Sequence, residues 1–221
     1  MRAAAPTPLP AAPAAALPGG LHDDLRATLR GRRFEAVVIG GSAGGVDAMI
    51  QLLPALPRDY TLPVFCILHL PGDRESRLAE LFAERLPVPV REAADKEGIV
   101  PGTVYFAGSG YHLSVECDRT FSLSCEPPVH FARPAIDVLM ESAADAYGPG
   151  LAGILLTGAN HDGAAGMAHI HACGGLTVVQ APSDAQVPTM PLEAIRRCSP
   201  DLILPLERIH ALLPMLENDK S

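Results

Sequence analysis

The sequence contains no run of apolar residues close to the roughly 20 that a membrane-spanning helix needs. Its longest apolar stretches, such as 151–156, have the length of a strand and are bounded by glycine. Basic side chains are also few: 17 Lys and Arg stand against 25 Asp and Glu, a formal net charge of −8. A nucleic-acid-binding protein normally carries a basic patch or stripe. We therefore expect neither insertion into a membrane nor binding to nucleic acid.

Cysteine is scarce as well, with five in 221 residues and no Cys-x-x-Cys pair. An odd count without close pairing supports neither a disulfide framework nor a cysteine-ligated metal site. These thiols suit a reducing, cytoplasmic setting. We expect no bound metal and no cofactor.

Residues 1–20 consist almost entirely of Ala, Pro and Leu. Prolines at positions 6, 8, 10, 13 and 18 interrupt the apolar helix that a signal peptide requires, although an export signal remains the alternative. We interpret residues 1–33 as a disordered Ala/Pro-rich tail followed by a short linker helix within 21–33 that ends at Gly31. Residues 34–217 are then expected to form one folded domain.

Short β-branched runs alternate with helical patterns from residue 34 onward. This alternation is typical of the α/β class. We predict a largely parallel, doubly wound sheet with helices on both faces and a small antiparallel hairpin formed by 112–116 and 121–124. The other strands are expected at 35–39, 64–70, 88–92, 103–107, 151–156, 176–180 and 202–204, and the helices at 44–53, 75–85, 134–147, 163–173, 191–197 and 207–216.

The strongest local motif is Gly40-x-Ser42-x-Gly44, between a predicted strand and a predicted helix. A nucleophile elbow occurs in this context. The turn strains the serine backbone, flanking glycines avoid Cβ clashes, and the helix N-terminus offers free N–H groups to an oxyanion. The spacing does not match a dinucleotide fingerprint, and no Walker A lysine is present. On this motif alone, a Gly-rich turn that binds phosphate or only reverses the chain remains open.

A serine hydroxyl needs a general base to act as a nucleophile. Of eight histidines, His69 closes the apolar strand at 64–70, and His112 at the start of the hairpin is its main rival. The base in turn needs a carboxylate to orient it, and Asp162 lies just after the strand at 151–156. Capping of the helix that follows is the alternative role for Asp162.

Ser42, His69 and Asp162 each follow the C-terminal end of a predicted core strand. The C-terminal ends of parallel strands share one edge of a sheet, where ligands bind. Three residues of triad type at one edge favour a serine hydrolase with Ser42 as the nucleophile. The chain order Ser, His, Asp differs from the Ser, Asp, His order of α/β-hydrolases, so a different scaffold is expected.

Several blocks in order, spanning roughly residues 34–204, resemble the catalytic domain of CheB-type chemotaxis methylesterases. The blocks are Val38-Ile39-Gly40-Gly41-Ser42-Ala43-Gly44-Gly45; Leu68-His69-Leu70-Pro71; Val104-Tyr105-Phe106-Ala107 with Gly110-Tyr111-His112-Leu113; Arg133-Pro134-Ala135-Ile136-Asp137; Leu156-Thr157-Gly158 with Asp162-Gly163-Ala164-x-Gly166; and Gln180 with Met190-Pro191. One block would be weak evidence, but the ordered set is specific. The resemblance makes 34–217 a CheB-type catalytic domain.

The resemblance implies that Ser42, His69 and Asp162 are the family's catalytic triad. It implies hydrolysis of γ-glutamyl methyl esters on the cytoplasmic helices of methylated chemoreceptors, with release of methanol, in signal transduction. Deamidation of receptor glutamines is a related family activity. Backbone N–H groups near Ala43 and in the loop that contains Ala159 are the implied oxyanion donors, and this loop also forms a wall of the substrate site.

Some positions depart from the family pattern. Ala159-Asn160 stands where Met-Gly is usual, which leaves the wall beside the site less filled. Asn tolerates a left-handed backbone, so we expect the loop to keep its shape. Ala135 stands where Ser is common, and Gly108-Ser109 replaces a Pro-Pro-like stretch.

Residues 1–33 are too few for the N-terminal receiver domain that is common in this family. We therefore expect a stand-alone catalytic domain, or one that a response-regulator or kinase partner controls in trans. Two alternatives to the methylesterase remain. One is a non-catalytic regulatory or binding module of the same fold, and the other is a hydrolase of small esters.

Overall fold

The computed structural model describes residues 20–69 and 76–217. The expected disordered tail therefore lies mostly outside the described residues, and the division of the chain near residue 33 stays a prediction. Contacts divide the chain into two compact units, Met1–Arg30 and Gly31–Ser221. The first contains helix α1 (Gly20–Leu29), in the stretch where a linker helix was predicted.

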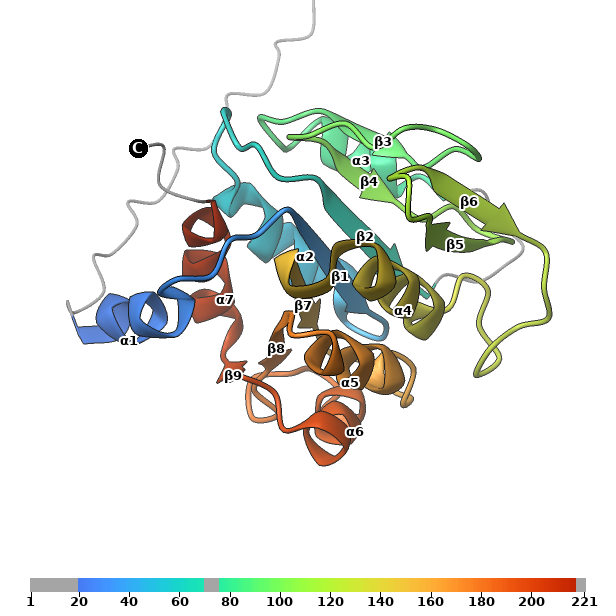
Figure 1. The fold of residues 1–221 in the computed structure, drawn as a ribbon. Coiled ribbons are helices and arrows are strands. Elements are labelled where there is room, and N and C mark those ends of the chain that lie inside the picture. Colours follow the sequence, from blue (N-terminus) through green and yellow to red (C-terminus); the bar gives the residue numbers. More distant parts are fainter. Residues whose placement is uncertain (1–19, 70–75, 218–221) are drawn as a thin grey trace, which may run out of the picture. The chain divides into compact units, whose positions relative to one another are not determined.

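Seven parallel strands form the main sheet of the second unit, in the order β3-β4-β2-β1-β7-β8-β9 (Figure 1). The first strand along the chain is therefore central, and later strands add on both of its sides, as in a doubly wound fold. The strands are β1 (Ala36–Gly41), β2 (Val64–Leu68), β3 (Val90–Glu92), β4 (Val104–Phe106), β7 (Leu151–Leu155), β8 (Leu176–Gln180) and β9 (Leu202–Leu204).

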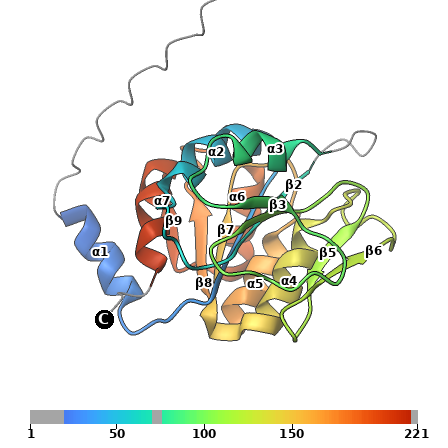
Figure 2. The same cartoon turned by 90° about the horizontal axis from the view of Figure 1, so that it is seen from above.

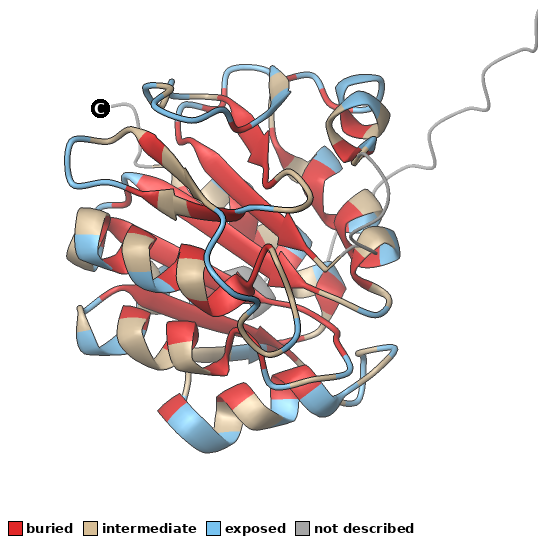
Figure 3. Cartoon of the chain, turned by 90° about the vertical axis from the view of Figure 1, so that its right-hand side faces the viewer, coloured by how far each residue is buried: buried red, intermediate tan, exposed pale blue. Residues whose placement is uncertain are grey.

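Helices cover both faces of this sheet (Figures 1 and 2). One face carries α4 (Ile136–Tyr147), α5 (Ala164–Ala172) and α6 (Thr189–Cys198), and the other carries α2 (Gly45–Leu52), α3 (Leu78–Ala83) and α7 (Leu206–Leu212). Strands β1, β2, β7 and β8 are buried along their whole length between the two helical layers (Figure 3). Continuous burial explains why these strands have apolar runs rather than alternating patterns.

The predicted hairpin is present as β5 (His112–Val115) and β6 (Phe121–Ser124), paired antiparallel. Phe121 anchors it to the main sheet, because its ring meets Phe65 edge-on at 5.5 Å and Tyr105 at 4.8 Å between centroids. Aromatic pairs at such distances add to the stabilisation from buried area. The hairpin thus fixes the start of the segment 125–135, which runs back to the sheet edge.

The α/β prediction is confirmed, with a local difference at the last helix. The helix expected over 207–216 ends at Leu212, and a 3₁₀ turn (Leu213–Leu216) follows. Pro214 lacks the N–H that an α-helix would need there. All five cysteines are free thiols. No helix among the residues that the structure describes is both long and apolar enough to cross a bilayer.

Candidate active site

Ser42 follows β1, His69 follows β2 and Asp162 follows β7, and β2, β1 and β7 are direct neighbours in the sheet. Strand register brings the first two together: Gly41 pairs with Leu68, so the residues after them leave adjacent strands at the same level. Adjacent strands lie about 4.8 Å apart. The predicted convergence of these residues at one edge is therefore built into the strand order and register.

The turn after β1 is held from the neighbouring strand. The Ser42 N–H donates to the Thr157 carbonyl at 2.9 Å, and the Ser42 carbonyl accepts from the Gly45 N–H at 2.7 Å. The Thr157 hydroxyl lies 2.9 Å from the Ala43 carbonyl and accepts from the Val187 N–H at 2.8 Å. Thr157, which sequence reasoning placed only in a family block, thus fixes the backbone on both sides of the serine side chain.

Backbone strain was expected at Ser42, and this expectation is wrong. Ser42 is not among the described non-glycine residues with positive φ, whereas Gly44, the residue before α2, has φ +79°. A residue with a side chain is strained in this left-handed region. Gly44, two residues after the serine, therefore makes the tight turn possible.

His69 and Asp162 form a short, shielded hydrogen bond. The distance from His69 Nε2 to Asp162 Oδ2 is 2.6 Å, and the Asp162 side chain is fully buried while the His69 side chain is 14% exposed. An ionised carboxylate only accepts, so Nε2 carries the proton and Nδ1 is left as the basic nitrogen. Nδ1 has no hydrogen-bond partner among the described residues, so it is the ring nitrogen that is left open.

The alternative role of Asp162, capping its own helix, is not observed. Its carboxylate instead accepts from the first turn of α4, with Oδ2 bonded to the Ile136 N–H at 2.8 Å and Oδ1 to the Asp137 N–H at 2.9 Å. Asp137 caps the other helix in the same way, since its Oδ1 accepts hydrogen bonds from the Gly163 and Gly166 N–H groups at the start of α5. Each helix start is therefore capped by an aspartate of the other segment, which anchors Asp162 in place.

The two buried aspartates differ in how readily they ionise. Burial raises the pKa of the Asp137 carboxyl, and the nearby Asp162 charge raises it further, against the lowering effect of the Gly166 N–H. Burial also opposes ionisation of Asp162, but hydrogen bonds from His69 and two backbone N–H groups outweigh it, so its pKa lies below the usual value. Asp162 is thus the carboxylate that carries the charge beside His69.

Donor atoms of His130, Asp137 and Asp162 lie within 4.8 Å of one another, which raises the question of a metal. Both carboxylates are already engaged, because each accepts two backbone N–H groups and meets one imidazole. The donor set is therefore a hydrogen-bonded anchor for the two helix starts, and we assign no metal to it.

His112, the rival base, is buried with both ring nitrogens occupied. Its Nε2 lies 3.1 Å from the Pro127 carbonyl and its Nδ1 accepts from the Ala135 N–H at 3.3 Å. It supports the segment that leads into α4 and has no free nitrogen for a substrate.

Two of the N–H groups expected near the oxyanion are open. No described residue accepts a hydrogen bond from the N–H of Ala43 or of Ala159, and both residues are exposed. The Gly158 N–H between them is used, because it donates to the Val187 carbonyl at 3.1 Å. Ala43 and Ala159 are therefore among the donors of this region that are left for a ligand.

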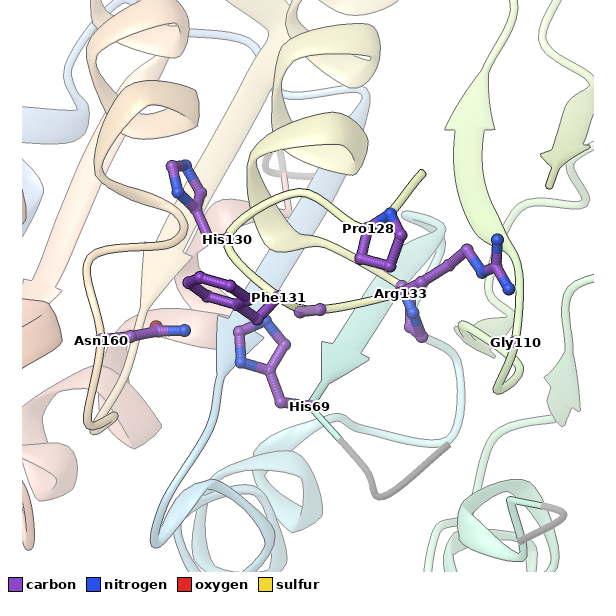
Figure 4. A pocket seen from close by; sticks show the side chains of 9 residues that line it. His69, Gly110, Pro128, His130, Phe131, Arg133 and Asn160 are labelled. Atoms are coloured by element: carbon purple, nitrogen blue, oxygen red, sulfur yellow. The ribbon is translucent and has the colours of Figure 1, made fainter. Parts of the chain in front are cut away.

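The Ala159-Asn160 loop keeps its position by a different means from the one expected. Asn160 does not have a positive φ; the left-handed residue is Gly163, with φ +93°. The Asn160 side chain instead accepts from the Asp162 N–H at 3.2 Å. Asn160 also lines a cavity of about 430 Å³ that contains His69 (Figure 4). The substitution thus places a polar side chain beside the His69–Asp162 pair.

The fold and this edge define a parallel α/β protein with a serine turn and a His–Asp pair at its topological switch point. The description of the CheB methylesterase family matches residues 37–213. The chain belongs to the CheB methylesterase family.

Relatives and a solved structure agree with this assignment. A protein of Leptospira interrogans is 42% identical over 186 residues, which cover 84% of this chain and 96% of that protein. A protein-glutamate methylesterase/protein-glutamine glutaminase of Anaeromyxobacter dehalogenans is 39% identical over 206 residues, 91% of this chain and 57% of its own length. The crystal structure of the Thermotoga maritima CheB methylesterase catalytic domain is similar with a TM-score of 0.75 and 28% identity, over 81% of this chain and 99% of that one.

Proposed function

We propose that this protein is a serine hydrolase that removes methyl groups from glutamate γ-methyl esters of a protein substrate. The observation that carries the proposal is the 2.6 Å bond between His69 Nε2 and Asp162 Oδ2. These residues follow β2 and β7, the strands on either side of the strand β1 that leads into Ser42. Relatives whose names state protein-glutamate methylesterase activity support the substrate class.

In the proposed mechanism, Ser42 Oγ attacks the ester carbonyl and His69 Nδ1 takes its proton. Asp162 holds the ring and stabilises the imidazolium that forms. The Ala43 and Ala159 N–H groups receive the oxyanion, and loss of one such donor typically costs about 3 kcal/mol of barrier. The imidazolium then protonates the departing methoxide, methanol leaves, and water attacks the acyl-enzyme by the reverse proton path.

Methylated chemoreceptor helices are the proposed substrate, because the chain belongs to the CheB methylesterase family. An amide in place of the ester would release ammonia by the same steps, so glutamine deamidation is a proposed second activity. A response-regulator or kinase partner acting in trans is the proposed source of control.

The test is methanol release from a methylated receptor fragment by the protein and by Ser42→Ala. We expect the variant to lose roughly 10⁴-fold or more in kcat. A fluorophosphonate should label the protein at Ser42 and leave Ser42→Ala unlabelled. Full activity of the variant would show that Ser42 is not the nucleophile.

A further inference from the structure

The most exposed large apolar side chain of the described residues stands at the candidate active site. Phe131 is 104% exposed, whereas the other exposed large apolar residues reach at most 46%. It lines the same cavity as His69, His130 and Asn160 (Figure 4). Water-exposed aromatic surface at a site of this kind is a common mark of recognition of another molecule.

The backbone that presents Phe131 is strained. His130 has φ +50° and Phe131 has φ +63°, and a pair of hydrogen bonds between Val129 and Ala132 closes a two-residue turn around them. Such turns prefer Asn-Gly, because bulky residues with positive φ are disfavoured. A sequence under no other demand would avoid Phe at this position.

Contacts on both sides of the turn hold it in this strained form. His130 Nε2 lies 3.1 Å from Asp137 Oδ2, and the His130 ring meets the His161 ring at 4.2 Å between centroids. On the other side, the Arg133 guanidinium donates to the carbonyls of Cys125 and Glu126. Strain that the surroundings maintain is typical of functional sites, and here it fixes an aromatic ring in water.

The cavity beside Phe131 suits an acidic protein segment. Among the described residues that line it, none carries a carboxylate, while Arg133 is cationic. The chain as a whole has a net charge of −8, so this lining differs from the average surface. A volume of about 430 Å³ accepts a glutamate ester side chain with neighbouring atoms.

We propose that Phe131 is the docking residue for the protein substrate: its ring packs on an apolar side chain one helical turn from the glutamate ester held beside His69. On a helix, residues four apart lie on the same face, so both side chains reach the enzyme together. Glutamates near the ester then face Arg133. This inference rests on the proposed function for the identity of the substrate.

The test uses two synthetic helical peptides that contain one glutamate γ-methyl ester among glutamates, with either leucine or serine four residues after the ester. Binding is measured by fluorescence anisotropy in the Ser42→Ala background, so that the ester survives. We expect Phe131→Ala to weaken binding of the leucine peptide about tenfold and of the serine peptide less than about twofold. Phe131→Leu should retain most of the affinity for the leucine peptide.

A matched control is Ile203→Ala, which removes another exposed apolar side chain, on the edge strand β9, and should leave both affinities unchanged. Thermal unfolding checks that each variant is folded. Equal losses with both peptides would overturn the proposal, because Phe131 would then act on the loop and not on the leucine. Unchanged binding, no binding of either peptide, or a dimer that Phe131→Ala dissociates in sedimentation would overturn it too.

The same peptides separate this inference from the proposed function. If the protein with Ser42 intact releases methanol and Phe131→Ala leaves peptide binding unchanged, docking is refuted and the esterase is supported. Phe131-dependent binding without methanol release would support docking and refute the esterase.

Discussion

Replacing Asp162 by Asn tests the orienting bond and the helix anchoring in one substitution. The carboxylate serves three donors: Oδ2 meets His69 and the Ile136 N–H, and Oδ1 meets the Asp137 N–H. An amide of the same shape has one accepting oxygen, so in either orientation one buried N–H of α4 faces an NH₂ group. A buried donor left without an acceptor costs about 1–3 kcal/mol.

The same change removes the charge that stabilises the His69 imidazolium. The comparable replacement in a serine protease triad costs roughly 10⁴ in kcat. Since each factor of ten corresponds to 1.36 kcal/mol, this is about 5 kcal/mol of barrier. We therefore expect Asp162→Asn to lose roughly 10⁴-fold in methanol release and about 1–3 kcal/mol in the free energy of unfolding.

Two assays separate the effects: initial rates of methanol release and urea denaturation near neutral pH. Ser42→Ala is the matched control for stability, because the Ser42 hydroxyl has no hydrogen-bond partner among the described residues and its loss should change the free energy of unfolding by less than about 0.5 kcal/mol. A rate within tenfold of the wild type would refute the orienting role of Asp162. Unchanged stability would refute the reciprocal capping.

The pH dependence of stability in acid also tests the lowered pKa of Asp162. Because the pKa of Asp162 in the folded protein lies below its ordinary value of 3.8, its ionised form contributes stability above that value. This contribution is lost as the pH falls through the lowered pKa. The stability difference between the protein and Asp162→Asn should therefore shrink in strong acid, and a difference that grows would contradict the assignment.

Other substitutions test further parts of the site. Gly44→Ala should cost at least about 1–2 kcal/mol, because its φ is +79° and a Cβ there would collide with the Gln186 side chain, and it should also slow methanol release. Gly174→Ala, with φ +81° and only ordinary contacts, should cost stability alone. Equal rates for both variants would contradict the role of the Gly44 turn. Asp137→Asn can keep the Gly163 and Gly166 bonds. Because the folded pKa of Asp137 is raised, its ionisation costs stability as the pH rises above 3.8. The stability of Asp137→Asn relative to the wild type should therefore increase as the pH rises from 3.8 through the raised pKa, as measured by urea titrations at several pH values. A constant difference would show that Asp137 is not perturbed.

Much of the fold was predictable because its signals are local. Buried strands such as 64–68 are continuous apolar runs, and the residues that follow them mark the carboxyl edge. The shared carboxyl edge placed Ser42, His69 and Asp162 on one side of the sheet, and the observed strand order makes the strands before them direct neighbours. The roles of these three residues in catalysis remain predictions.

The features that the sequence did not predict share one physical cause: they depend on contacts between segments that are distant in the chain. Sequence alone could not show that Asp162 caps α4 rather than its own helix, since Ile136 lies 26 residues away. The positive φ at Phe131 also has no local signal, because Phe is disfavoured in such a turn.

By itself, the sequence determined the α/β class, the serine turn and the residue types at one sheet edge, because periodicity and glycine spacing act over a few residues. Only the tertiary structure decided which nitrogen of His69 meets Asp162 and which of the two buried aspartates carries the charge. It also decided that an exposed Phe131 stands beside this pair. Those properties arise from burial and from hydrogen bonds that form when α4, α5 and the loop at 129–132 pack together.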